Sequence, residues 1–192
     1  MSDDAYHHGD LRRAVMAAAV DAIAESGPAT WSLRELARRA GVSHAAPAHH
    51  FGDKAGLLTA VAAEGYALFA DALEAAGDDF HDVGLAYIRF AIGHRAHFEV
   101  MFRPELYRTG DPEVAAARAR AYGVLVRGAR SVAPGRPRGD LTAPTAAWSI
   151  VHGFAELWLR GALPAELGDD PEAAAEPVLS LLFEKPARTA GT

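Results

Sequence analysis

Residues 26–54 hold helix start and stop signals so closely spaced that few backbone arrangements can satisfy them all. Gly27-Pro28 predicts the end of a helix, because glycine accepts a left-handed backbone and proline cannot continue the helix. Ser32-Leu33-Arg34-Glu35 matches a capping box and predicts the start of the next helix. Gly41-Val42-Ser43 predicts a tight turn, with Ser43 capping a short helix that ends near Phe51. Two short helices joined in this way are typical of a helix-turn-helix, whose second helix enters the DNA major groove.

Helical periodicity extends on both sides of this motif. It predicts a first helix over about 10–26, and Asp53 is expected to cap a long helix from 54 to about 76. Further helices are predicted over about 82–95, 96–106, 112–132, 143–160 and 171–184. Because no segment reads as a strand, we predict an all-α protein with about nine helices.

The predicted helices divide into two functional parts. We expect a three-helix helix-turn-helix DNA-binding domain over residues 1–54 and a helical ligand-binding and dimerisation domain over 55–186, with a frayed tail over 187–192. The last two long helices carry more apolar residues than one buried face needs. They are therefore the predicted dimer interface.

Cysteine usage and the chain's beginning bear on location. The sequence has no cysteine, so disulfides and thiolate metal sites are excluded. Its acidic start is not followed by the apolar stretch of a signal peptide, and no run approaches the length of a membrane span. We expect a cytoplasmic protein without a membrane partner or a cofactor.

Global charge gives little support to a nucleic-acid partner, because the chain carries a net charge of −6. The local balance differs. Residues 31–54 carry four Lys/Arg against two Asp/Glu, and five of the nine histidines precede residue 55. The basic signal therefore coincides with the predicted helix-turn-helix.

Particular residues in this region resemble a known family. Leu33-Arg-Glu-Leu-Ala-Arg-Arg-Ala-Gly-Val-Ser43 and His50-Phe-Gly-Asp-Lys-Ala-Gly-Leu-Leu58 closely resemble the TetR/AcrR family of regulators. Tyr6-His-His-Gly-Asp-Leu11 looks like the start of one subgroup of that family. Trp148-Ser-Ile-Val-His-Gly153 resembles the Trp-His-Gly element of the same subgroup's C-terminal domain.

The resemblance implies a homodimeric transcriptional regulator that binds a pseudopalindromic double-stranded DNA operator. A small, largely apolar effector in the C-terminal domain would release it, and repression is the commoner mode in the family. Carried over by position, the residues expected to face DNA are Ser43, His44, Ala45, Ala46, His49 and His50. Lys54 is expected to meet a phosphate at a helix N-terminus, and Arg34 is a second phosphate candidate.

Ala48 departs from the family pattern, which usually has a tyrosine that touches the DNA backbone. His49 and His50 are candidates to compensate, since imidazole can donate to phosphate or to guanine. DNA affinity is then predicted to rise as pH falls from about 8 to 6. The alternative is that these histidines are solvated or pack against neighbours. Tyr6-His7-His8 is either an arm that reaches DNA or a mobile end.

Aromatic, sulfur and histidine side chains gather in the second half of the chain. An apolar pocket with a few polar anchors suits a small ligand. The predicted ligand-binding residues are Phe90, His94, Phe98, Met101, Phe102, Tyr122, Trp148 and His152. The alternative is an ordinary helical core rich in aromatic residues.

His94 and His97 stand at a spacing that can chelate a metal, with Glu99 or His152 as a further ligand. Two histidines at helical spacing are usually ordinary, so no metal site is predicted.

Two other classes of function compete with a regulator. An enzyme is disfavoured because the nucleophile elbow, the phosphate loop, the dinucleotide fingerprint and the His-Glu-x-x-His motif are missing. The second alternative is a helical small-molecule-binding or scaffold protein without specific DNA binding, which Ala48 and the overall acidity would suit.

Overall fold

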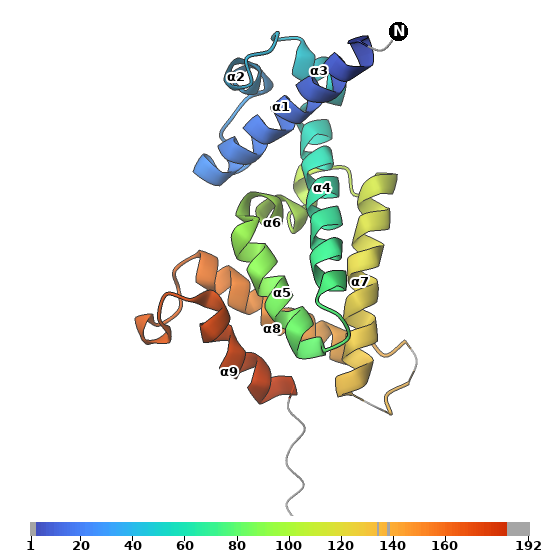
Figure 1. Ribbon diagram of the computed structural model, residues 1–192, viewed down its shortest axis with the longest axis vertical. Coiled ribbons are helices and arrows are strands. Elements are labelled where there is room, and N and C mark those ends of the chain that lie inside the picture. Colours follow the sequence, from blue (N-terminus) through green and yellow to red (C-terminus); the bar gives the residue numbers. More distant parts are fainter. Residues whose placement is uncertain (1–2, 134, 138, 184–192) are drawn as a thin grey trace, which may run out of the picture. The chain divides into compact units, whose positions relative to one another are not determined.

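The computed structural model describes residues 3–133, 135–137 and 139–183. These residues form nine α-helices and two short 3-10 helices without a strand, which confirms the all-α prediction (Figure 1). In chain order the elements are α1 (Asp3–Ser26), α2 (Leu33–Arg39), α3 (Ala46–Phe51), α4 (Lys54–Ala75), α5 (Phe80–Gly93), α6 (Arg95–Met101), η1 (Pro104–Leu106), α7 (Pro112–Val132), α8 (Thr142–Leu159), η2 (Ala165–Leu167) and α9 (Pro171–Phe183). The predicted tail at 187–192 and the side chains of the predicted arm at 6–8 lie outside the described part.

Side-chain caps begin several of these helices where the sequence predicts them. Ser32 Oγ accepts a hydrogen bond from the Glu35 N–H at 3.2 Å, and Asp53 Oδ1 accepts one from the Gly56 N–H at 2.7 Å. The other half of the predicted capping box differs. The Glu35 carboxylate accepts from Arg39, 3.1 Å from its Nε. Asp111 likewise caps α7.

The start of α3 differs from the prediction. Ser43 does not cap the helix, which begins at Ala46 after Ala45, an N-cap without a side-chain hydrogen bond. The Ala46 N–H donates instead to the Ser43 carbonyl at 3.0 Å, so residues 43–46 form a further turn. Gly41 has the predicted positive φ of 67°. The connection between α2 and α3 is therefore longer than the three residues expected.

The chain forms two compact units, each built from separate pieces of sequence. Unit 1 comprises Met1–Leu68 and His94–Arg118, and unit 2 comprises Phe69–Gly93 and Ala119–Thr192. Helices α4 and α7 contribute residues to both. This division does not follow the predicted boundary after residue 54, because α6 returns to pack against α1. A functional division at that boundary stays a prediction.

Unit 1 has an apolar interior formed by α1, α2, α3, the first part of α4 and α6. Val15, Ile23, Leu36 and Leu57 are almost completely buried in it. Helix α4 approaches α6 closely at Gly65, where a Cβ atom would lie 2.7 Å from the Met101 sulfur. Small residues at such points allow helices to touch, and here they fix α6 within unit 1.

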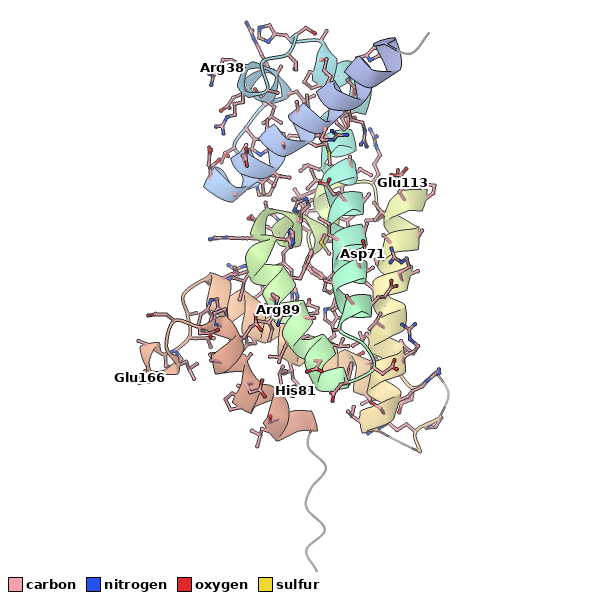
Figure 2. The ribbon with its side chains drawn as sticks, in the orientation of Figure 1. Arg38, Asp71, His81, Arg89, Glu113 and Glu166 are labelled. Atoms are coloured by element: carbon pink, nitrogen blue, oxygen red, sulfur yellow. The ribbon has the colours of Figure 1, made fainter. Side chains whose placement is uncertain are left out.

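Unit 2 is organised around α5, against which both α8 and α9 pack (Figure 1). Gly84 on α5 leaves room for Leu179 on α9, whose Cδ1 would lie 3.1 Å from a Cβ at that position. Arg89 on α5, labelled in Figure 2, donates from Nε to Glu172 on α9 at 2.8 Å. An apolar contact and an ion pair therefore both join these helices.

Helix α4 meets the length and composition criteria for a membrane span, although no such segment is expected from the sequence. However, 61% of its most apolar window is buried inside the protein. A core helix passes the same test, so this is weak evidence for a membrane.

Candidate nucleic-acid interface and ligand site

The helix-turn-helix is held together by apolar residues from three helices that pack pairwise: α1, α2 and α3. Leu36 on α2 is completely buried, and Phe51 at the end of α3 is 8% exposed. Pro47 occupies the first turn of α3, as predicted, and is also buried. The Arg12 guanidinium lies 5.4 Å from the centre of the Phe51 ring, a cation–π contact that covers the outer side of this core.

Most predicted DNA-facing residues lie on the accessible side of the turn and of α3. Ser43, His44, Ala45 and His49 are exposed, while His50 is half-buried with its ring edge-on to that of His49. Ala46 is the exception. This residue is only 7% exposed, so little of it is accessible on this side, and its contact with DNA stays a prediction.

The two predicted phosphate contacts differ in their surroundings. Arg34 is exposed at the start of α2. The Lys54 ammonium instead donates to the backbone carbonyls of Ala29 at 3.1 Å and Trp31 at 2.9 Å. It also lies 4.1 Å from the centre of the Trp31 ring, and burial lowers the pKa of the Lys54 amine. Lys54 therefore fastens the loop before α2 to the start of α4.

A second pair of cations lies at the end of α2. Arg39 donates to Glu25 at 2.7 Å and to Glu35, which raises the pKa of its guanidinium. Arg38 is exposed (Figure 2) and forms no ion pair within the described chain. Both line a hollow of about 580 Å³ between α1 and α2 whose other walls include Asp21 and Glu25.

Sequence reasoning missed Arg108. Its Nη2 lies 3.0 and 2.9 Å from the two carboxylate oxygens of Asp53, the cap of α4. The Arg108 backbone N–H donates to Thr59 Oγ1 at 3.0 Å, and that threonine is 6% exposed. The two residues are 55 positions apart, and no sequence motif predicts a contact at that separation.

A hydrogen-bonded group of three side chains, Tyr87, Trp148 and His152, lies in unit 2. Trp148 Nε1 donates to the Tyr87 hydroxyl at 3.2 Å, and that hydroxyl lies 2.9 Å from His152 Nδ1. Because the hydroxyl oxygen accepts from Trp148, its proton is placed to be donated to Nδ1. Burial lowers the pKa of His152, which favours the neutral ring, while the Glu156 charge acts in the opposite direction.

Aromatic side chains surround the Tyr87 end of this group. The Phe69 ring lies edge-on to Tyr87 at 5.0 Å between ring centres, and 4.9 Å from Phe90. Polar atoms set among aromatic rings are the kind of anchor that orients a small ligand.

The remaining predicted ligand residues are not gathered with this group. His94, Phe98, Met101 and Phe102 belong to unit 1, while Tyr122 in unit 2 is exposed. Phe98 and Met101 are each 1% exposed in the unit 1 core. Neither unit by itself therefore contains the predicted eight-residue pocket.

His94 and His97 lie with ring centres 5.9 Å apart, so the predicted adjacency is present. His97 Nε2 lies 3.0 Å from a Glu64 carboxylate oxygen. The pKa of His94 is lowered mainly by burial and to a lesser degree by the neighbouring His97. Among the residues described, no three His, Cys, Asp or Glu side chains are grouped to hold a metal ion.

Family models match both halves of the chain. Residues 15–61 match the model described as bacterial regulatory proteins, tetR family, and residues 80–182 match the tetracyclin repressor-like C-terminal domain. No curated protein matches the chain.

Solved structures with the same fold also match the chain. A protein of unknown function from Rhodococcus sp. RHA1 is 31% identical, with coverage of 93% of this chain and 96% of that one and a TM-score of 0.74. A bacterial regulatory protein in the tetR family from Rhodococcus RHA1 is 22% identical, with coverage of 90% and 95% and a TM-score of 0.68. The multidrug binding protein EbrR, solved with imidazole, is 22% identical, with coverage of 92% and 91% and a TM-score of 0.56.

The helix-turn-helix in unit 1 and the two family matches lead to the same assignment. The predicted Trp-His-Gly subgroup is not tested by these matches and stays a prediction. The chain belongs to the TetR family of DNA-binding transcriptional regulators.

Proposed function

We propose that this regulator is a cytoplasmic, non-enzymatic repressor, and that a small, largely apolar effector releases it from a pseudopalindromic operator. The observation that carries the DNA-binding part is the exposure of Ser43, His44 and His49 beside a buried α3 core. His44, Ala45, His49 and His50 are the proposed contacts to bases and backbone, with Arg34 as the proposed phosphate contact.

Binding to the DNA that flanks the protein's own gene tests this part of the proposal. We expect a specific complex whose affinity falls steeply with salt, because phosphate contacts release counterions. Replacing His44 should alter the preference at one base position, whereas Arg34→Met should weaken binding to all sequences. If no complex with this DNA forms at low salt, the protein is instead a small-molecule-binding protein without specific DNA binding.

The effector is proposed to bind beside the Tyr87 hydroxyl, Trp148 and His152, with the Phe90 ring on its apolar side. Hydrogen-bonding side chains next to aromatic rings suit an apolar molecule that carries one polar group. The other predicted ligand residues are not required for this placement.

A thermal-shift screen of small aromatic and aliphatic compounds, followed by DNA-release assays of the stabilising ones, tests the effector site. Tyr87→Phe removes the central hydroxyl and should weaken a compound that releases DNA by about tenfold. Tyr122→Phe makes the same change at an exposed tyrosine and should leave its affinity unchanged. Equal effects of the two variants would place the effector elsewhere.

A further inference from the structure

The junction between α3 and α4, residues 52–56, is closely packed at Gly56. A Cβ atom at Gly56 would lie 1.9 Å from the Phe51 carbonyl oxygen, so the first turn of α4 rests directly on the last residue of α3. Contacts this close do not exist between real side chains and backbone, so this glycine permits the approach. The start of α4 and the end of α3 are therefore in close approach at Gly56.

Arg108 holds the outer side of this junction. Its guanidinium pairs with both oxygens of Asp53, and its Nη1 would lie 3.0 Å from a Cβ at Gly56. Asp53 also accepts the Gly56 N–H, so one carboxylate joins the arginine to the first turn of α4. The side chain of Arg108 therefore lies over the point where α3 and α4 meet.

The backbone of Arg108 is fastened to the same helix one turn further along. Its N–H donates to Thr59 Oγ1, whose hydroxyl donates to the Ala55 carbonyl at 2.7 Å. Thr59 is buried, so this bond is shielded from water and fixes where the arginine side chain begins. An exposed ion pair is usually weak, because ordering two long side chains costs entropy. Here the backbone of Arg108 is already held by Thr59, which reduces that cost.

We propose that Arg108 is a positioning residue for DNA recognition: through Asp53 it sets the orientation of α4 and hence of α3. The inference rests on the DNA-binding role of α3 proposed above. Arg108 acts on Asp53 and not on DNA. Its loss is therefore expected to reduce specific binding, which needs a defined orientation of α3, more than non-specific binding, which needs charge.

Hydrogen–deuterium exchange of the DNA-free full-length protein tests the structural step independently of DNA binding. Arg108→Gln should raise exchange over residues 51–59 up to about fivefold, the effect expected of one exposed ion pair. Arg103→Gln is the matched control, because Arg103 forms ion pairs with Glu99 and Glu105 only a few residues away. Equal exchange in the two variants would overturn the proposal.

DNA affinity tests the functional step. Arg108→Gln should weaken binding to the operator about fivefold, leave binding to unrelated DNA unchanged and preserve the salt slope. Asp53→Asn keeps an N-cap acceptor but removes the charge, and combining it with Arg108→Gln should add little further loss. Additive losses, or a salt slope that becomes shallower by about one unit in Arg108→Gln, would show a direct phosphate contact and overturn the positioning role. If no operator complex forms with the unaltered protein, the proposed function fails, while the exchange result still stands.

Discussion

At the scale of single residues, the positively charged side chains near α3 differ in whether they already bind a partner within the protein. Arg39 is paired with two carboxylates and Lys54 with two backbone carbonyls, whereas Arg34 is exposed and forms no ion pair with any described residue. A charge engaged within the protein must give up those partners before it can meet a phosphate. The sequence assigned Lys54 and Arg34 the same role, and their surroundings now separate them.

Lys54→Met should therefore act mainly on stability. It removes two hydrogen bonds to a charged donor and a cation–π contact, so about 1–2 kcal/mol of the unfolding free energy should be lost. This corresponds to a fall in melting temperature of roughly 2–8 °C. Arg34→Met is the control, with an unchanged melting temperature and a DNA-binding salt slope shallower by about one unit. The reverse pattern would return Lys54 to the phosphate contact expected from the sequence.

Gly56→Ala should disrupt the α3–α4 junction, because the added methyl would overlap the Phe51 carbonyl. We expect operator affinity to fall at least about tenfold, together with a lower melting temperature. Gly93→Ala places the same methyl group in open space on a helix, so it should be tolerated. Isothermal titration and thermal unfolding of both variants measure the contrast, and equal behaviour would refute the close approach.

At the scale of elements, the sequence predicted most helices because their caps and periodicity are local. Asp53 caps α4 as the sequence predicts, and Asp111 and Asp170 cap α7 and α9 in the same way. The predicted start of α3 is wrong because Ser43 is a residue type that commonly caps helices. In the structure its backbone carbonyl instead accepts from the Ala46 N–H, which forms a turn before the helix begins.

Long-range features were beyond local reasoning. The cap of α3 lies two residues later than the sequence predicts, at Ala45 instead of Ser43. Ala46 was expected to face DNA from its position in the family pattern, and its burial depends on how α3 packs against other helices. The predicted ligand-binding residues were chosen from the sequence because they are aromatic, sulfur-containing or histidine side chains. Their division between the two units depends on chain topology, because α6 belongs to unit 1 and α5 to unit 2.

The exposed histidines of the turn and α3 predict a pH dependence of DNA binding. The affinity for the operator is predicted to rise as pH falls from about 8 to 6. A variant with His44→Gln and His49→Gln should show a flatter profile at the same salt concentration. Fluorescence anisotropy with labelled operator gives the measurement; a flat profile in the unaltered protein, with the fold intact, would exclude this role.

His152 on α8 leads us to expect that the stability of the fold decreases as pH falls, whereas DNA affinity is predicted to rise. Burial lowers the pKa of His152 in the folded state, so the unfolded chain takes up a proton more readily. Stability from this residue is complete above pH ~6.5 and is lost as pH falls toward the lower folded-state pKa. His94, whose pKa is also lowered, acts in the same direction. Thermal unfolding at pH 7.5 and 5.5 should show a smaller decrease for His152→Gln than for the unaltered protein.

At the scale of the whole molecule, α8 and α9 leave large apolar side chains exposed. Leu157 on α8 is 46% exposed and Leu181 on α9 is 82% exposed. Apolar groups at this exposure favour burial against another surface, and the family works as dimers. We therefore retain these two helices as the proposed homodimer interface.

Leu181→Glu should shift the protein toward the monomer, because a carboxylate in an apolar interface lacks a partner. Light scattering coupled to size-exclusion chromatography measures the mass directly. Leu167→Glu, at an exposed leucine of η2 outside α8 and α9, should leave the mass unchanged. An unaffected dimer in Leu181→Glu would show that this side chain lies outside the interface.

The internal engagement of Arg39 and Lys54 has a consequence for how the operator is found. Non-specific binding to genomic DNA depends on positive charge on the protein. This chain has a net charge of −6, and two of the four Lys/Arg side chains in residues 31–54 already bind groups within the protein. Its residence on arbitrary sequence should be brief, with little sliding between neighbouring sites. Most encounters with the operator should then come from solution, and few copies of the protein would be sequestered along the chromosome.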